Sequence, residues 1–309
     1  MWISDQAVVA SKRNKLRLVL VSMRPDQWTT NALLFAALLF SRNIFHPAQV
    51  LTSVFAFGIF CLASGAVYVL DDLLHLEQDR THPKERARPL VSGALDPGTG
   101  ALAFSVLLPV SVLAGCLING TFLLAVLADL VLQIAYCTFL KRIVLLDVFA
   151  VASGFFLRVV AGSAAIGAPM SKWLLVCTIF FSLFLALARR RHELPALGEG
   201  AGEHPKVLEE YNLLFLDQMV SIATAGTILS YSLYTLSEET VARFGTSQLW
   251  LTVPIVLYGI SRYLYHVYRQ GDGGQPEEPL WKDRPLLTCV AVYVVSVVLI
   301  LYSHSGSLA

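Results

Sequence analysis

The chain has 309 residues, of which 56% are hydrophobic and only 15% are charged, and its mean hydropathy is +0.63. This composition excludes an ordinary soluble domain and indicates a polytopic membrane protein. The formal net charge of +1 gives no reason to expect a nucleic-acid partner.

Nine apolar segments are long enough to cross a bilayer, which takes about 20 residues each. They lie at 24–41, 48–71, 98–118, 121–140, 145–164, 172–188, 214–236, 248–268 and 286–304. The expected fold is therefore an all-α integral membrane protein with nine transmembrane helices. Residues 1–22 are expected to form a basic amphipathic segment at the membrane surface, and residues 23–309 a single transmembrane domain.

Lysine and arginine are distributed unequally between the two sides of this predicted bundle. If the N-terminus is cytoplasmic, only Arg42, Lys172 and Arg243 fall on the outer side, and almost all the others face the cytoplasm. The positive-inside rule therefore predicts a cytoplasmic N-terminus in a multi-pass protein of the cell membrane.

The first segment begins with Arg24-Pro25-Asp26-Gln27-Trp28. Proline is typical of the first turn of a helix. Arg24 and Trp28 are equally well explained as anchors at the membrane interface. Gln27 and Asn31 are four residues apart and form a polar pair inside a span, so Asn31 is a candidate substrate contact.

The second segment ends in a dense charge cluster within residues 68–93. Asp72, His75 and Asp79 are spaced to lie on one face of a helix. Mg²⁺ prefers carboxylate oxygens and is usually held by one or two carboxylates together with substrate phosphates. Asp72 and Asp79 are therefore predicted metal ligands, with Asp71 as a further ligand and His75 as a poorer one. The alternative is a helix end that is merely solvated by its charges.

The basic residues after these acids are predicted to contact phosphate groups, namely Lys84, Arg86 and Arg88. The fourth segment likewise ends in Lys141 and Arg142, which are further candidates for binding a phosphate.

The fifth segment begins near Asp147 and contains Arg158. At about 1.5 Å per residue, Arg158 lies about 16 Å further along the helix, near the middle of the membrane. An unpaired charge there is costly, so Arg158 is expected to pair with Asp147 or with another helix.

The sixth segment ends in Arg189-Arg190-Arg191-His192-Glu193. Arg189 and Arg190 are candidate phosphate contacts, and Glu193 brings another carboxylate to the same side of the membrane. Because the second, fourth and sixth segments all run inward, their polar ends are predicted to share one pocket that faces the cytoplasm.

Taken together, these motifs resemble the UbiA superfamily of intramembrane prenyltransferases, and within it the decaprenyl-phosphate phosphoribosyltransferase-like branch. The resemblance covers nearly the whole chain. It rests on RPDQWTTN (24–31), DDLLHLEQDRTHPKERARPLVSG (71–93), YCTFLKRIVLLDVFAVASGFFLR (136–158), ARRRHEL (188–194), VLEEYN (207–212) and LWKDRPLL (280–287).

The resemblance implies a nine-span bundle, Mg²⁺ as cofactor, phosphoribosyl pyrophosphate as donor and a polyprenyl phosphate as acceptor. The family motif NDxxDxxxD maps onto residues 71–79, where Asp71 replaces the Asn and His75 replaces the middle Asp. Asp72 and Asp79 are retained. Family members commonly carry Lys where this chain has Thr30.

This resemblance implies catalytic roles for Asp72, Asp79 and Lys141. Lys141 and Arg142 are expected to hold the lipid phosphate or the 5-phosphate of the donor. Asp147 and Glu193 are expected to orient ribose hydroxyls or a second metal ion.

Two other functions stay open from the sequence. The first is prenyl transfer from a prenyl diphosphate to an aromatic ring, although RRRHEL stands where such enzymes usually carry a second Asp-rich motif. The second is a non-catalytic transporter of a lipid or metabolite.

Overall fold

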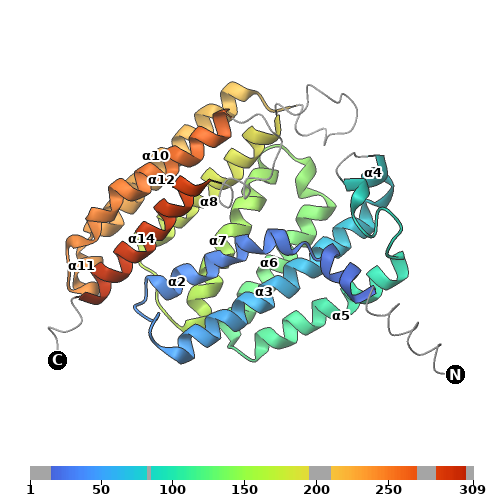
Figure 1. The fold of residues 1–309 in the computed structure, drawn as a ribbon, viewed down its shortest axis with the longest axis horizontal. Coiled ribbons are helices and arrows are strands. Elements are labelled where there is room, and N and C mark those ends of the chain that lie inside the picture. The colour runs from blue at the N-terminus through green and yellow to red at the C-terminus, as the bar shows by residue number, and fades with distance from the viewer. Residues whose placement is uncertain (1–14, 82–84, 195–209, 270–282, 304–309) are drawn as a thin grey trace.

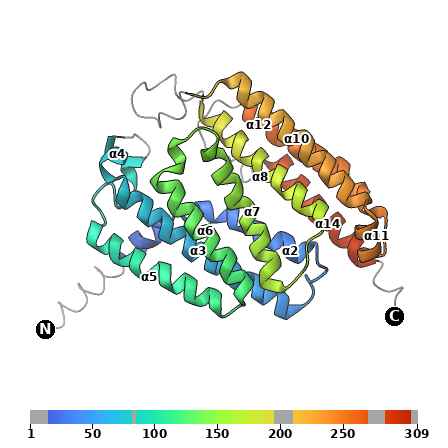
Figure 2. The same cartoon turned by 180° about the vertical axis from the view of Figure 1, so that it is seen from behind.

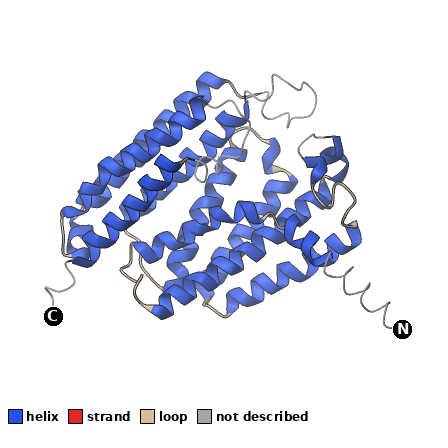
Figure 3. Cartoon of the chain, in the orientation of Figure 1, coloured by secondary structure: helices blue, strands red, loops and turns tan. Residues whose placement is uncertain are grey.

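The computed structural model describes residues 15–81, 85–194, 210–269 and 283–303, and the regular structure within these ranges is entirely helical (Figure 3). The long helices are α3 (Pro47–Leu74), α5 (Pro97–Cys116), α6 (Gly120–Thr138), α7 (Leu146–Ile166), α8 (Lys172–Glu193), α10 (Leu213–Leu236), α12 (Val253–Arg269) and α14 (Arg284–Ser303). The shorter elements are η1 (Pro25–Leu34), α2 (Phe35–Leu39), α4 (Leu76–Thr81), η2 (Glu85–Ala87), η3 (Leu140–Arg142), α11 (Glu238–Phe244) and η5 (Gln248–Thr252).

Within the described ranges, seven helices are long and apolar enough to cross a membrane, so the chain is a multi-pass membrane protein. They are α3, α5, α6, α7, α8, α10 and α14. The first and eighth predicted segments are instead divided into η1 with α2, and η5 with α12. Nine spans and a cytoplasmic N-terminus therefore stay predictions, as does a surface role for residues 1–22, most of which lie outside the described ranges.

The 3-10 geometry of η1 has local causes. Arg24 precedes it with φ of 51°, and Pro25 occupies its first position. The hydroxyl of Thr30 donates a hydrogen bond to the backbone oxygen of Gln27, at 2.9 Å. Threonine side chains that bond to the nearby backbone compete with regular α-helical hydrogen bonding. The start of the first predicted segment is thus tightly wound.

Side-chain caps fix where the long helices begin. Asp96, Asn119, Ser171 and Asn212 each accept a hydrogen bond from a backbone N–H in the first turn of α5, α6, α8 and α10. Such caps satisfy N–H groups that have no partner within the helix. Two of these caps, Asn119 and Ser171, begin helices that run toward the same end of the bundle.

The helices are arranged so that α3 packs along α5 and α8 packs along α10, with α6 and α7 in contact between them. Figure 1 shows α10, α12 and α14 side by side on one flank of the bundle, and α3 with α5 on another. The C-terminal ends of α3, α6 and α8 point toward the same end of the molecule, as both Figure 1 and Figure 2 show. We call this the polar end.

The η1–α2 segment approaches α7 more closely than side chains would allow. A Cβ atom added at Gly162 would lie 2.1 Å from the backbone oxygen of Leu34. Because glycine lacks this atom, the two backbones meet directly, as small residues permit in membrane bundles. This contact sets the position of η1, which begins next to Arg24 and carries Asn31.

We expect Gly162→Ala to destabilise the protein by about 1–3 kcal/mol, because overpacking must push η1 away from α7. Gly58→Ala is the matched control on α3, since a Cβ there meets nothing within 4 Å, and it should change stability by less than about 1 kcal/mol. Thermal unfolding of the detergent-solubilised variants measures both. Equal midpoints for Gly162→Ala and the unmodified protein would contradict the close contact.

Candidate functional site

The acidic motif lies at the polar end, where α3 gives way to α4. The spacing predicts one continuous helix through Asp72, His75 and Asp79, and this is wrong in detail. Helix α3 ends at Leu74, and His75 leaves helical geometry with φ of −118° before α4 begins. Asp72 and Asp79 nevertheless stay close enough to share a partner.

That partner is Arg88. Its Nη1 atom lies 3.2 Å from Oδ1 of Asp72 and 3.1 Å from Oδ2 of Asp79, and its Nη2 atom lies 2.8 Å from Oε1 of Glu85. Arg24 donates a second charged hydrogen bond to Oδ1 of Asp72. The Asp72 side chain is fully buried, so these cations offset the cost of removing its charge from water.

The neighbouring Asp71 faces a different set of cations. Lys141 Nζ and His75 Nδ1 each lie 3.2 Å from its Oδ1 atom, and Arg24 lies 3.8 Å from its Oδ2 atom. The hydrogen bond with Asp71 raises the pKa of His75 above its ordinary value, against the opposing effect of burial. His75 is therefore engaged by Asp71, and whether it also ligates a metal stays a prediction.

Asp79 lies in a different electrostatic setting. Burial, followed by the hydrogen bond and the charge of Glu85, raises the pKa of Asp79 to about 7, although Arg88 opposes the shift. Two carboxyl groups in contact share a proton readily because both cannot be charged without cost. Asp79 therefore takes up a proton nearer to neutral pH than an ordinary aspartate does.

The segment after η2 holds Arg88 in place. Leu90 and Leu95 are 1% exposed and pack with Met23 and Val69 in one apolar cluster. The backbone N–H of Arg88 donates to the carbonyl of Glu85 at 3.0 Å. The backbone is therefore fixed against α3, while the guanidinium extends toward the acids and stays 25% exposed.

A second polar cluster is centred on Asp147 at the start of α7. Tyr211 donates a hydrogen bond to its Oδ1 atom at 2.6 Å, and Arg190 Nε forms an ion pair with its Oδ2 atom at 2.7 Å. The Tyr211 hydroxyl also accepts from the backbone N–H of Leu145 at 2.7 Å. Burial, with the Asp147 carboxylate next, raises the pKa of Tyr211, so the hydroxyl remains a donor.

The end of α6 links the two clusters. Lys141 in η3 reaches Asp71 at 3.2 Å, and Tyr136 one turn earlier accepts a hydrogen bond from Arg190 at 3.1 Å. The polar ends of α3, α6 and α8 are therefore joined by continuous contacts, as their shared direction along the chain predicts.

The remaining predicted site residues are placed as follows. Arg86 and Arg142 are exposed at the same end, and Arg189 lies on the last turns of α8. Lys84 and the side chain of Glu193 lie outside the described residues. Oδ1 of Asp147 accepts from Tyr211 and Oδ2 lies in the ion pair with Arg190, and the expectation that Asp147 orients ribose or a second metal stays a prediction.

Arg158 is the centre of a third, buried network inside the bundle. Its Nε atom donates to Asn31 Oδ1 at 2.7 Å, and its Nη1 atom donates to the Gly154 carbonyl at 2.7 Å and to Asp129 Oδ1 at 3.3 Å. Gln133 also donates to Asp129. The sequence predicts that Arg158 pairs with Asp147 or with another helix. The pairing with another helix is confirmed, since Asp129 lies on α6. The pairing with Asp147 is wrong, because Asp147 pairs with Arg190.

Sequence reasoning missed Asp129 and the role of Arg24. Asp129 is a lone acid within an apolar segment, and Arg158 is a lone base within another. Such a complementary pair of intramembrane charges is itself a signal for a contact between two helices. Arg24 gives no comparable signal, because an arginine at the start of a span is also a common interface anchor.

The acid cluster meets only part of what Mg²⁺ requires. Within the described ranges, no three His, Cys, Asp or Glu side chains gather closely enough to hold a metal ion, because Arg88 lies between Asp72 and Asp79. The Oδ2 atom of Asp72, however, is buried and has no hydrogen-bond partner. A buried carboxylate oxygen in this state suits a hard cation, so the residues fit a metal that is completed by substrate phosphates.

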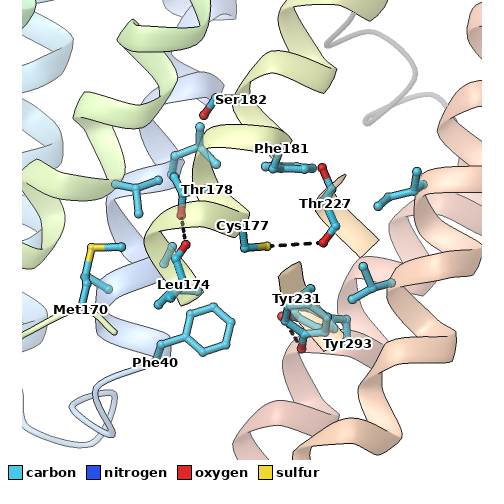
Figure 4. A pocket seen from close by; sticks show the side chains of 16 residues that line it. Phe40, Met170, Leu174, Cys177, Thr178, Phe181, Ser182, Thr227, Tyr231 and Tyr293 are labelled. Atoms are coloured by element: carbon cyan, nitrogen blue, oxygen red, sulfur yellow. Dashed lines mark hydrogen bonds between the residues drawn. The ribbon is translucent and has the colours of Figure 1, made fainter. Parts of the chain in front are cut away.

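An apolar cavity of about 250 Å³ lies deeper in the bundle, between η1–α2, α7, α8, α10, α12 and α14 (Figure 4). Its polar groups are mostly engaged: Thr178 donates to the Leu174 carbonyl, and Tyr231 bonds with Thr252, each at 2.7 Å. Ser182 lines the cavity on the same helix as Arg190, about 12 Å away along the axis. The cavity offers contacts for hydrocarbon.

Residues 31–277 match the sequence model of the UbiA prenyltransferase family. The chain is 30% identical over 301 residues to decaprenyl-phosphate phosphoribosyltransferase of Mycobacterium tuberculosis, covering 96% of this chain and 98% of that protein. The identity is also 30% over 308 residues to the protein of the same name from Corynebacterium glutamicum, covering 97% and 91%. A solved UbiA homologue from Archaeoglobus fulgidus, bound to GPP and Mg²⁺, superposes with a TM-score of 0.68 at 17% identity, covering 92% of this chain and 99% of that one.

The buried pair in the third network makes a prediction about stability. Asp129→Leu alone leaves the Arg158 charge buried without its acid, so we expect a loss of about 3–5 kcal/mol. The double variant Asp129→Leu/Arg158→Met replaces both charges with apolar groups of similar size and should recover most of that loss. Thermal unfolding in detergent gives both values.

The control is the exposed pair between Lys15 and Asp96, 3.7 Å apart. Lys15→Gln should cost less than about 1 kcal/mol because solvent screens that pair. A double variant as unstable as Asp129→Leu would show that the two side chains are not coupled to each other.

Proposed function

The chain belongs to the UbiA prenyltransferase family of intramembrane transferases, and from this premise we propose that it transfers a 5-phosphoribosyl group from phosphoribosyl pyrophosphate to a polyprenyl phosphate, with Mg²⁺ as cofactor. The proposal is supported by the phosphoribosyltransferases that resemble the chain over nearly their whole length. The polar end would face the cytoplasm, where a soluble donor is available, in agreement with the distribution of basic residues.

The observation that carries the choice of donor is the end of α8. Its arginines are paired with acids from other elements: Arg190 with Asp147, and Arg191 with Asp217 at 3.0 Å. Lys141 contacts Asp71 of the acid cluster, and the neighbouring Arg142 is exposed. A donor with a pyrophosphate on C1 and a phosphate on C5 needs two anion-binding regions. The structure has cations both at the end of α8 and beside the acid cluster.

Asp72 and Asp79 would hold the metal, whereas the carboxylate of Asp71 is paired with Lys141 and His75. Mg²⁺, when bound, would neutralise the negative charge that builds on the departing pyrophosphate. Arg24 fixes the orientation of Asp72, and Arg86, Arg88 and Lys84 would contact the pyrophosphate oxygens. The ribose anomeric carbon would then be attacked by an oxygen of the lipid phosphate. That oxygen is already anionic at neutral pH, so the reaction requires no general base.

The lipid acceptor would place its phosphate near Lys141 and Arg142 and a later part of its chain in the apolar cavity, about 12 Å or more deeper in the bundle. A volume of about 250 Å³ is below the range of about 300–1,000 Å³ that is usual for complete ligand pockets. The cavity would therefore take only one segment of the chain, and the remainder would extend into the bilayer.

The main alternative is prenyl transfer to an aromatic ring, which would use the same metal and pyrophosphate chemistry. The Archaeoglobus fulgidus homologue was solved with a prenyl diphosphate, GPP. Its 17% identity shows the fold alone. The transporter alternative is set aside, because the family and the relatives are transferases.

The first experiment compares donors. Purified protein in detergent, supplied with Mg²⁺, radiolabelled phosphoribosyl pyrophosphate and a polyprenyl phosphate, should yield a labelled lipid. Asp72→Asn and Asp79→Asn should each lower turnover about a hundredfold or more, because each removes a carboxylate from the charge-stabilising site. Glu77→Gln is the control, since Glu77 is an exposed acid in the same helix as Asp79. Labelling only from a prenyl diphosphate and a phenolic acceptor would establish the alternative.

The second experiment tests the cavity. Ala36→Phe adds a ring to a residue that lines it, so the KM for the polyprenyl phosphate should rise about tenfold, in line with the loss of roughly 1.4 kcal/mol of binding. The KM for the soluble donor should not change. Ala32→Phe, an exposed position one turn earlier, is the matched control. Equal lipid KM values in the two variants would exclude the cavity as the lipid site.

A further inference from the structure

The guanidinium of Arg88 occupies the space between the two carboxylates that fit a metal ion. One nitrogen, Nη1, is 3.2 Å from Asp72 and 3.1 Å from Asp79, and the other terminal nitrogen is bound to Glu85. At the same time, the second oxygen of Asp72 is buried without a partner. The acids are thus held together by a cation of the protein itself.

This arrangement opposes the binding of a metal ion alone. A divalent cation that approached Asp72 and Asp79 would either break two charge-assisted hydrogen bonds or lie beside a guanidinium of like charge, and both are unfavourable. The balance changes if the ion arrives together with a diphosphate. The diphosphate oxygens then offer Arg88 new acceptors in place of the carboxylates that it gives up.

The two arginines on Asp72 differ in how freely they can move. Arg24 is 14% exposed, lies 4.9 Å from the centre of the Tyr68 ring and also contacts Asp71. Arg88 is 25% exposed, and its backbone is anchored by the neighbouring buried Leu90. Its long side chain can therefore change partners without any displacement of the fold, whereas Arg24 is confined from several sides.

We propose that Arg88 is an exchangeable counter-ion: it holds Asp72 and Asp79 together while the site is empty of donor, and transfers to the diphosphate when the metal and diphosphate enter together. Arg24 remains on Asp72 in both states. The metal consequently binds with the donor and not before it. This inference rests on the proposed function only in taking the donor to be a diphosphate.

The test measures metal binding directly. Mn²⁺ replaces Mg²⁺ as the probe, and protein-bound Mn²⁺ is measured by equilibrium dialysis with and without inorganic pyrophosphate, so that the Mn²⁺ complexed by pyrophosphate in solution is equal on both sides. In the unmodified protein, pyrophosphate should strengthen Mn²⁺ binding at least about tenfold, the effect of roughly one charge-assisted hydrogen bond. In Arg88→Gln, Mn²⁺ alone should bind more tightly than to the unmodified protein, and the strengthening by pyrophosphate should be lost.

Two further variants define the comparison. Arg80→Gln removes an exposed arginine of α4 that is not assigned to the site, and it should behave like the unmodified protein, which excludes a general effect of net charge. Asp72→Asn should abolish Mn²⁺ binding under both conditions. Arg88→Lys keeps the positive charge but has only one nitrogen to contact the carboxylates. If Arg88→Gln does not fold, Arg88→Lys takes its place and should give values between those expected for Arg88→Gln and for the unmodified protein.

The proposal is overturned if Arg88→Gln binds Mn²⁺ alone no better than the unmodified protein, or if it keeps the full strengthening by pyrophosphate. Because pyrophosphate is the leaving group of both a phosphoribosyl and a prenyl donor, this result does not depend on which group is transferred. A failure of phosphoribosyl transfer in the labelling assay would therefore not contradict the exchange of Arg88 between carboxylates and diphosphate. Likewise, a failure of the Mn²⁺ test would not contradict phosphoribosyl transfer.

Discussion

The structure depends on one constraint: an acid buried in this bundle must meet a base from another part of the chain. Each buried aspartate within the described ranges forms an ion pair with an arginine. The pairs are Asp72 with Arg24 and Arg88, Asp79 with Arg88, Asp129 with Arg158, Asp147 with Arg190, and Asp283 with Arg262. In a membrane, an unpaired charge would cost far more than most packing contacts contribute. These pairs therefore determine which helices are neighbours and where they stop.

The ion pairs inside the bundle and at its polar end differ in how completely their hydrogen bonds are satisfied. The Asp129–Arg158 pair is closed on all sides, since Asn31, Ser64, Gly154 and Gln133 complete its hydrogen bonds. It joins η1, α3, α6 and α7 and leaves no oxygen for a ligand. At the polar end, Asp72 keeps one oxygen without a partner and Arg88 bridges two acids. A buried oxygen without a partner is available to a ligand that enters beside it.

The membrane also separates the two kinds of chemistry that a lipid transferase needs. The charged clusters gather where α3, α6 and α8 end, while the cavity behind them is lined by apolar groups and by hydroxyls, most of which already have hydrogen-bond partners. Helix α8 contributes to both regions, Ser182 to the cavity and Arg190 to the polar end. One rigid helix therefore fixes the depth at which hydrocarbon gives way to charge. A substrate with a long apolar chain and an anionic head meets both environments.

Local patterns in the sequence determined much of this protein. Apolar runs located the long helices to within a few residues, and the charge cluster at residues 71–88 identified the acids and the arginine that meet there. The tertiary structure alone decided the partners: Arg24 on Asp72, Asp129 on Arg158, Tyr211 and Arg190 on Asp147. It also decided the break at His75 and the winding of η1. The physical reason is the separation along the chain of the residues that interact. Periodicity and capping act between residues a few positions apart, whereas an ion pair between helices depends on how distant segments pack, which no local spacing encodes.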